Sequence, residues 1–451
     1  MVSRLDASAW RPIHTRIVLA LAVGWALDSF EIQIIGSVIG PIGKEFHLSH
    51  TDESVVYWLV WFGGIMAGAL GFGWLADRFG RRRMFAATLI LYSVAAVLTA
   101  LSPSWAFFLV FRFLTALGVG GEYSAVSSAM AEFVPARRRG LANGGIMNAW
   151  SVGGILAGVV GILFVGDVLG PAGWRYAFLF GAAAGLYGLF VRRLIPESPR
   201  WLAARGRHEE ADAAIRLVTG LEPDAEAPDL HHRDPSFAEG ARELWRDHRS
   251  KLLYGMALDF SEAAAYYGIF SFIAVFVLVK GVVNVGTGTV PWYFVLANVG
   301  ALGGGFTVAW LLDRVGRKPT VFWSYTAAAL TTIGLAYAAT QHSAVLTLVA
   351  LVVAVFCASG AWMSAYPTFS ELFPTHLRAT GVGACVAVGR VGAVVGVVVL
   401  AETATSFGVW TAFLSLSALW AIGAVASGIW WLRGREGRGL SLEILAQPHT
   451  T

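Results

Sequence analysis

The sequence predicts an all-α polytopic membrane protein with twelve transmembrane helices, arranged as two pseudo-symmetric six-helix bundles. Charged residues make up 14% of the 451 residues and hydrophobic residues 56%, whereas a soluble domain carries about 25% charged residues. The mean hydropathy is +0.63. Apolar stretches recur along the whole chain, and three short motifs of the first half return in the second. The composition predicts the membrane, and the recurrence predicts the two bundles.

Twelve apolar stretches reach the roughly 20 residues that a helix needs to cross a bilayer. The first stretch is longer than the apolar region of a signal peptide, and Asp28 and Glu31 interrupt it, so we expect an uncleaved first helix. The expected bounds are 14–41, 53–77, 83–102, 105–133, 140–167, 173–195, 252–280, 289–312, 319–340, 343–373, 379–405 and 408–432.

The positions of the cations predict the orientation, because Lys and Arg gather in cytoplasmic loops. Among the 33 Lys and Arg residues, Arg112 and Arg390 fall deep inside spans, and Lys44, Arg175 and Lys280 fall in loops opposite the termini. The others fall on the side of the two termini, which are therefore expected in the cytoplasm. Cations scattered between spans form no single basic patch, so the expected surroundings are a lipid bilayer and no nucleic-acid partner is expected.

A polar stretch divides the chain between the sixth and seventh spans. Residues 196–250 combine periodic ends with a Pro- and Asp-rich break at 222–235, which favours short amphipathic helices around a loop. The expected organisation is a first bundle over 1–195, this cytoplasmic linker, a second bundle over 251–433 and a cytoplasmic tail over 434–451.

Three motifs occur in both halves in the same order, at offsets of 231, 236 and 239 residues. Because six spans separate the copies, the two halves share one orientation, as in parallel repeats that move around a site at the membrane midplane. The pairs are GWALDSFE at 24–31 with GMALDFSE at 255–262, GWLADRFGRR at 73–82 with AWLLDRVGRK at 309–318, and EFVPARRR at 132–139 with ELFPTHLR at 371–378.

These motifs resemble a known family over nearly the whole chain. GWLADRFGRRR, its weaker copy LLDRVGRK, and Arg112 followed by GVGGE are similar to signature motifs of the major facilitator superfamily. PESPRWL after the sixth span resembles the branch with sugar porters, organic ion transporters and bacterial niacin or aromatic-acid:proton symporters. The resemblance implies a transporter that works by alternating access, as a monomer, in a bacterial inner membrane. The seventh span lacks the paired glutamines of sugar porters, so a sugar is not expected.

Charges inside the membrane are the first candidates for the mechanism, because each costs at least about 2.5–3.5 kcal/mol on insertion scales. Asp28 and Glu31 lie three residues apart, on one helix face. Two carboxylates so close cannot both ionise cheaply, so one is expected to carry a proton unless a cation such as Arg112 compensates. By resemblance, sugar porters couple protons through a first-span carboxylate and this fourth-span arginine, and Glu31 matches that carboxylate. Asp28, Glu31 and Arg112 are therefore the proton-coupling candidates, the alternative being a fixed ion pair.

Arg390 is the candidate anchor for a substrate carboxylate, because its planar guanidinium matches a carboxylate and stays charged. At the 239-residue offset, the first half has Ser151 at this position. The alternative is that Arg390 pairs internally with one of the acids. Asp259 and Glu262 are expected along the substrate path or as relics of the repeat, and Glu122 as a third acid there or as a packing residue.

Aromatic side chains are the second indication of a substrate cavity. They stack on flat substrates, and Tyr and Trp also donate hydrogen bonds. The alternative for any one of them is a membrane-interface anchor, so we expect only some to touch substrate. The substrate-binding candidates are Tyr57, Trp61, Tyr123, Trp150, Tyr266, Trp362 and Tyr366.

Charged residues at the cytoplasmic ends of the spans predict a gate. Positive-inside bias explains the cations but not the matching acids, so ion pairs that break when the inward side opens are expected. The residues are Asp77, Arg78, Arg81, Glu132, Arg139, Glu197, Asp313, Arg317, Glu371 and Arg378.

Together these features predict a proton-coupled symporter that imports a small organic anion, with an aromatic or heteroaromatic carboxylate such as niacin or a benzoate as the expected substrate. The alternatives are a uniporter or exchanger of organic cations or zwitterions, and a sensor on the same fold. An enzyme is not expected, because no nucleophile with its base and no nucleotide-binding loop is recognisable. Cys357 and Cys385 lie singly in apolar spans, so neither a metal site nor a cofactor is expected.

Overall fold

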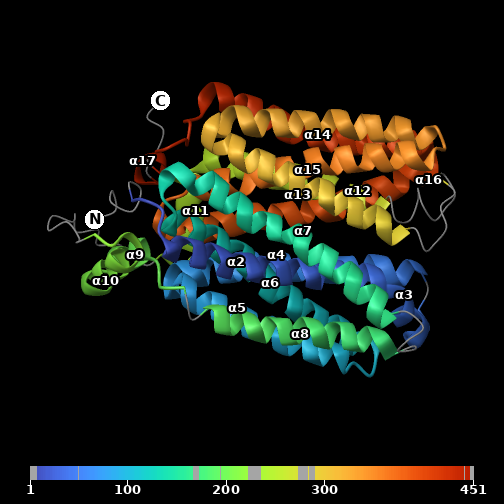
Figure 1. Ribbon diagram of the computed structural model, residues 1–451, viewed down its shortest axis with the longest axis horizontal. Helices are drawn as coiled ribbons and strands as arrows, with labels where there is room; N and C mark the ends of the chain where they lie inside the picture. The colour runs from blue at the N-terminus through green and yellow to red at the C-terminus, as the bar shows by residue number, and fades with distance from the viewer. Residues whose placement is uncertain are drawn as a thin grey trace.

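The computed structural model describes residues 8–48, 50–165, 172–192, 195–221, 235–272, 283, 290–440 and 442–446. Within these residues the chain is helical and carries no strand. The long helices run side by side along one direction (Figure 1), as backbone groups in a bilayer require, because a helix satisfies its hydrogen bonds internally. The fold is an all-α bundle of two six-helix halves.

The first half runs from α2 to α8. The expected first span is divided into α2 and α3, which are separated at Ile34, and α3 contains Pro41, whose ring removes one helical hydrogen bond. The helices are α2 (Pro12–Gln33), α3 (Ile35–Phe46), α4 (His50–Phe79), α5 (Arg81–Ala100), α6 (Trp105–Phe133), α7 (Arg139–Val165) and α8 (Gly173–Arg192).

The second half contains α12 to α16. The last two expected spans form one long element, α16, whose direction changes at Gly408, where φ is 86° and only glycine is comfortable. Residues 273–280 of the expected seventh span lie outside the described residues. The helices are α12 (Arg249–Phe272), α13 (Val290–Arg314), α14 (Arg317–Thr340), α15 (Ala344–Leu372) and α16 (Arg378–Arg433).

Nine described helical stretches are long and apolar enough to cross a membrane by length and composition alone. α8, α12 and α14 are not among them. In α12 the cause is visible, because the described part ends at Phe272 and carries Asp259 and Glu262 in its middle. The charges that lower its hydropathy are the ones expected to have a function.

The two halves meet along two symmetric helix pairs, α7 against α13 and α4 against α16. Small residues make both contacts close: Gly144 packs on Ala309, and Gly383 packs on the backbone carbonyl of Ala69. Gly144 and Gly383 are separated by the same 239 residues as the repeated EFVP/ELFP motifs. The duplication has therefore produced two equivalent close contacts between the halves.

Short helices gather at one end of the bundle, which we call the linker end. α9 (Pro199–Ala204), α10 (His208–Thr219) and α11 (Phe237–Asp247) belong to the segment between the halves, and α17 (Leu442–Ala446) follows the last span. Figure 1 shows these helices and the beginning of α2 at the same end of the molecule. Residues 222–234 of the expected Pro- and Asp-rich break lie outside the described residues.

Candidate transport site

The first half contains a buried arginine that is paired with a carboxylate. From α6, Arg112 Nη1 donates to Glu31 Oε2 at 2.9 Å, and Nη2 donates to the Glu31 carbonyl at 2.9 Å and to Tyr57 Oη at 3.0 Å. Glu31 and Arg112 are both fully buried. The pair expected from the sequence is therefore formed in the structure. Each charge compensates the other in the buried interior, and removing one partner would leave the other as an uncompensated buried charge.

Two of the expected substrate-binding aromatic side chains lie around Arg112. Trp61 lies under the guanidinium, with its ring centroid 4.1 Å from the Arg112 Cζ, and Tyr57 stacks on Trp61 with an interplanar angle of 12°. Phe178 of α8 faces the guanidinium as well, at 4.9 Å. Their rings cover Arg112 within the first half, and their contact with a substrate stays a prediction.

Asp28 and Glu122 form a separate acidic pair. Although Asp28 precedes Glu31 by one turn of α2, Arg112 hydrogen-bonds Glu31, and the Asp28 carboxyl interacts instead with the Glu122 carboxyl of α6. Glu122 was expected on the substrate path, but it lies behind α2, where Gly24 leaves room for its Oε2. The reason is helix geometry: Glu122 and Tyr123 are about 100° apart on α6, and Tyr123 is the one that faces the second half.

In the second half, Arg390 of α16 lies among hydroxyls and acids. Its guanidinium donates to Tyr267 Oη at 3.1 Å and to Tyr366 Oη at 3.2 Å, while Asp259 Oδ2 is 3.9 Å from Nη2. Glu262, one turn further along α12, interacts with both Asp259 and Arg390. Arg390 is thus near two carboxylates but is held most closely by neutral tyrosines. Both interpretations of Arg390, substrate anchor and internal partner, find a geometric counterpart here.

An aromatic cluster joins the halves beside Arg390. From the first half, Tyr123 lies 5.0 Å from the Arg390 Cζ. Trp150 meets Trp362 of the second half edge to face, with centroids 4.8 Å apart, and Tyr123 meets Tyr366 at 6.0 Å. All of these side chains are buried. The members of this central cluster are Trp25, Tyr123, Trp150, Tyr266, Trp362 and Tyr366, which includes five of the seven expected substrate-binding aromatics.

The linker end is closed by bonds between the halves. Asp77, at the end of α4, accepts hydrogen bonds from the backbone amide and hydroxyl of Thr380 at 2.8 and 2.7 Å and from the Ala379 amide at 3.2 Å. These amides belong to the first turn of α16, whose dipole favours a negative charge. Glu132 of the first half also accepts from Arg378 of the second at 2.8 Å and from Arg81 at 3.1 Å.

The equivalent acids of the second half contact the first half in the same way. Asp313, at the end of α13, accepts from the backbone amides of Gly140 and Leu141 in the first turn of α7, at 2.9 and 2.8 Å. Glu371 accepts from Arg317 at 2.9 Å and lies 3.8 Å from Arg139 of the first half. We call these two symmetric sets of contacts, in which Arg81–Glu132 and Arg317–Glu371 are pairs within one half, the linker-end gate. Apart from Arg78 and Glu197, every residue expected in the gate takes part in them.

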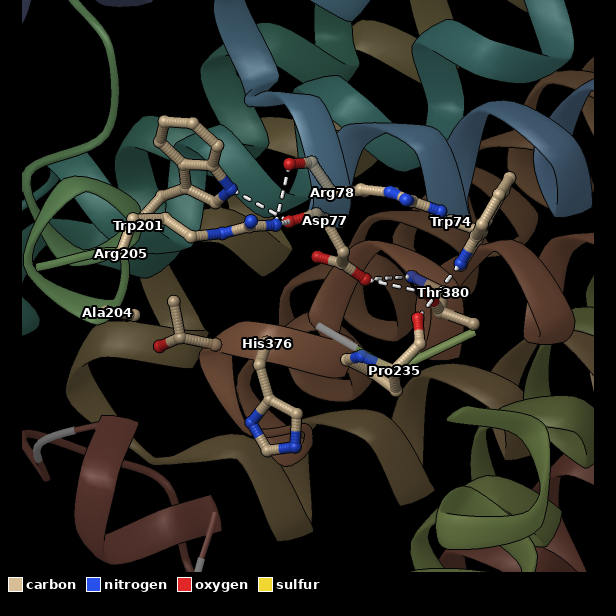
Figure 2. Close-up of a pocket in the computed structure, with 10 residues that line it drawn as sticks. Trp74, Asp77, Arg78, Trp201, Ala204, Arg205, Pro235, His376 and Thr380 are labelled. Atoms are coloured by element: carbon tan, nitrogen blue, oxygen red, sulfur yellow. Dashed lines mark hydrogen bonds between the residues drawn. The ribbon is translucent and has the colours of Figure 1, made fainter. Parts of the chain in front are cut away.

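Arg78 does not join the gate in the structure. Its side chain is exposed and lies over the rings of Trp74 and Phe79, both at 5.5 Å. Asp77 and Arg78 follow each other on a helix and point to different faces, so only Asp77 reaches the second half. Figure 2 shows this divergence, with the Asp77 carboxylate directed at Thr380.

The linker attaches to the same region through α9. Trp201 Nε1 donates to the Asp77 carbonyl at 2.8 Å, and Arg205 donates to the carbonyls of Asp77 and Arg78 at 3.0 and 2.6 Å (Figure 2). Free carbonyls at a helix end need such donors. A small pocket between these side chains is lined by Trp74, Asp77, Arg78, Trp201, Ala204, Arg205, Pro235, Thr375, His376 and Thr380.

Glu197 and Glu436 act as a symmetric pair of caps. Glu197 accepts from the amides of Arg81 and Arg82 at the start of α5, at 3.0 and 3.3 Å. Glu436 accepts from the amides of Arg317 and Lys318 at the start of α14, at 2.7 and 3.1 Å. Sequence reasoning missed Glu436, although it follows Glu197 by 239 residues, the offset of the third repeated motif.

Two repeated six-helix halves, a gate closed at one end and buried charges at the centre define a membrane transporter. The Major Facilitator Superfamily profile matches residues 21–397. The chain belongs to the major facilitator superfamily.

Named relatives in this family extend over almost the whole chain. The niacin transporter NiaP of Acinetobacter baylyi is 29% identical over 412 residues, covering 89% of each chain. The putative niacin/nicotinamide transporter NiaP of Bacillus subtilis is 29% identical over 444 residues, covering 96% of this chain and 99% of the relative. Organic cation/carnitine transporter 7 of Arabidopsis thaliana is 28% identical, covering 84% and 83%.

Solved structures show the same fold. The proton:xylose symporter XylE, bound to 6-bromo-6-deoxy-D-glucose, superposes with a TM-score of 0.79 at 20% identity and covers 96% of this chain and 98% of XylE. The human organic anion transporter MFSD10 gives a TM-score of 0.67 at 16% identity, covering 92% and 100%. At these identities the likeness establishes the architecture, and the chain is a multi-pass membrane protein of this architecture.

Proposed function

We propose that the protein is a proton-coupled symporter that imports a small, flat organic anion, with niacin or a benzoate as first candidates. The observation that carries the proposal is Arg390, a permanent cation that donates to the hydroxyls of Tyr267 and Tyr366 inside the central aromatic cluster. The names of the NiaP relatives support a pyridine carboxylate as the substrate to test first.

Arg390 and the central cluster suit such a ligand chemically. A substrate carboxylate would take the place of the two tyrosine hydroxyls as the hydrogen-bond acceptor of Arg390. Because a carboxylate is charged and can accept two hydrogen bonds at once, its bonds to the guanidinium are stronger. A flat ring then has aromatic faces from both halves to stack on, Tyr123 and Trp150 on one side and Trp362 and Tyr366 on the other. A ligand that touches both halves favours the closed state of the site, which is what alternating access requires.

Glu31 and Arg112 are the proposed coupling pair. Protonation of Glu31 removes the charge that holds Arg112 at 2.9 Å, and the guanidinium is then left with Tyr57 and the Glu31 carbonyl. A buried arginine without its counter-charge is costly, so the two protonation states favour different arrangements of α2 and α6. In this proposal, one transport cycle passes through both protonation states of Glu31. A proton therefore crosses the membrane with each anion.

The linker-end gate is proposed to face the cytoplasm. The cations of the sequence concentrate at this end, which supports an inner-membrane orientation with both termini inside. Breaking the Asp77–Thr380 and Asp313–Gly140 contacts would open the path inward and release the anion. Since both halves and the central cluster belong to one chain, a monomer is proposed to be the working unit.

The test is uptake of labelled niacin, benzoate and an organic cation into proteoliposomes with an imposed pH gradient. Niacin or benzoate accumulation that rises with the inward proton gradient supports the proposal, and uptake of acids indifferent to the gradient would contradict the symport. Arg390→Ala should abolish binding of the anion, and Arg390→Lys should restore only part of it because the planar fork is lost. Unchanged affinity in Arg390→Ala would refute the anchor.

A second candidate is an exchanger or uniporter of organic cations. Asp259 and Glu262 are two buried acids beside Arg390, and among these three described residues a surplus negative charge is left when both acids are ionised. Organic cation/carnitine transporter 7 is among the relatives. Uptake of the organic cation alone in the same assay, lost in Glu262→Gln, would favour this candidate over the anion symporter.

A further inference from the structure

Asp28 and Glu122 are a second set of buried ionisable groups that the proposed coupling pair does not use. Their carboxyl groups interact with each other, and both residues are fully buried. Glu122 also reaches Gly24, one turn before Asp28 on α2, and a methyl group added at Gly24 would lie 3.4 Å from Glu122 Oε2. The two carboxyls therefore meet across the contact between α2 and α6.

The described surroundings of Asp28 supply little to hold a negative charge. Phe85 of α5 covers the Gly24 side, and within the described part of the chain no N–H or O–H group is seen donating to either oxygen of Asp28. Arg112, on the same helix as Glu122, is engaged with Glu31 and Tyr57. The charged and titratable groups facing the pair are Glu31 on α2, Tyr92 on α5, and Tyr123 on α6.

Tyr92 is the independent observation that points to a ligand at this place. Its side chain is fully buried, and among the described residues its hydroxyl has no hydrogen-bond partner. It packs against Gly118, one turn before Glu122 on α6, and interacts electrostatically first with Glu122 and then with Asp28. A buried hydroxyl without a partner is rare, because it costs the hydrogen bond that it made with water. Here the hydroxyl interacts electrostatically with both carboxyls without being hydrogen-bonded to either of them.

We propose that Asp28 and Glu122 together bind one proton, between the Asp28 and Glu122 carboxyl oxygens, and that this is a second proton-binding site of the transport cycle beside Glu31. When the proton is bound, one carboxyl donates an O–H to the other carboxylate. When it leaves, both are carboxylates that repel each other across α2 and α6, with the Tyr92 hydroxyl as donor to one of them. The proton taken up on one side of the membrane is released on the other.

The consequence is a net positive charge carried with each anion. The proposal rests on the proposed function, in which Glu31 also carries a proton: two protons with one monovalent anion move one positive charge. Each coupled proton contributes about tenfold accumulation per pH unit of gradient. With the membrane potential held at zero, the wild-type protein should accumulate its anion about a hundredfold per pH unit, and a variant with one site about tenfold.

The direct test needs no substrate. Infrared difference spectra between acid and alkaline pH report the carbonyl band of a protonated carboxylic acid, which should appear in the wild type and in the control Glu402→Gln, an exposed acid outside the site. Because Glu31 also takes up a proton in the proposed cycle, the wild-type spectrum should contain its band and the band of the shared proton. The band that persists in Glu31→Gln should be lost in Asp28→Asn and equally in Glu122→Gln, because either change removes the shared proton. If Glu122→Gln keeps the band assigned to the shared proton, the proposal is wrong, whether or not this variant still transports the anion.

The second test measures charge movement with the anion that the uptake assay identifies. On a solid-supported membrane, the wild type should give a positive transport current, and Glu122→Gln should transport the anion with no current. If the wild type accumulates no anion in a proton gradient, the proposed function fails. If it does so while Glu122→Gln keeps the wild-type current and the hundredfold accumulation, only the second proton site fails.

Discussion

Asp77 offers the sharpest test of the linker-end gate, through the substitution Asp77→Asn. The carboxylate accepts three hydrogen bonds from the first turn of α16, at 2.7–3.2 Å, and its side chain is only 6% exposed. Asparagine keeps the size but has one acceptor oxygen and no charge. The closed state should therefore lose about 2–4 kcal/mol, the worth of one or two charge-assisted hydrogen bonds.

That loss translates into a large change of population. A difference of about 2–4 kcal/mol shifts the ratio of closed to open forms roughly 30- to 1,000-fold. Asp313→Asn is the matched comparison, because it occupies the same place in the second repeat but accepts two backbone bonds and is 14% exposed. Its effect should be smaller, about 1–2 kcal/mol, since water replaces part of the lost interaction.

The assay is electron–electron distance measurement between spin labels on opposite halves. Arg137 and Arg314 are exposed at the linker end of the first and second half, and both can be labelled after replacement of Cys357 and Cys385. The wild type should show one short distance, and Asp77→Asn a dominant longer one, while Asp247→Asn, an exposed acid of the linker, should leave the distribution unchanged. A wild-type distribution in Asp77→Asn would refute the reasoning that this carboxylate closes the gate.

Three further predictions concern other parts of the molecule. Glu31→Gln should keep anion counterflow while losing about tenfold of the proton-driven accumulation per pH unit, measured in proteoliposomes; complete loss of counterflow would indicate a structural ion pair instead. Glu436→Ala leaves two amides at the start of α14 uncapped and should lower the unfolding free energy by about 1–2 kcal/mol, read from thermal unfolding in detergent, with Glu402→Ala as the control. Gly383→Leu should hold the linker end open, because any side chain there meets the Ala69 carbonyl in the closed state; a closed distance in the spin-label assay would contradict this.

Much of the architecture was predictable because it follows from simple repeating patterns. Apolar length indicated the spans, and the shared motifs indicated two equivalent halves. The pairing of Glu31 with Arg112 was predictable because a buried cation needs a buried anion at the same depth. The gate acids were predictable because cations alone do not explain them. Glu436 could have been found too, since it stands at the same 239-residue offset from Glu197 as the repeated motifs.

The side-chain directions were not predictable in the same way. Asp28 and Glu31 share a helix face, yet one meets Glu122 and the other Arg112, because two neighbouring helices pack against that face. Glu122 was expected beside the substrate, but its sequence neighbour Tyr123 is the residue that turns to the second half. Periodicity gives the direction relative to the helix axis only, and the packing of the other helices decides what each direction meets.

The central claim, co-transport of a proton with an organic anion, is tested most directly by measuring both in one experiment. Proteoliposomes that contain a pH-sensitive dye, with the membrane potential held at zero, receive niacin outside without any imposed pH gradient. The account predicts that niacin entry acidifies the lumen beyond the protein-free liposomes, and that Arg390→Ala abolishes this excess. Niacin entry through the wild-type protein with no accompanying acidification would contradict it.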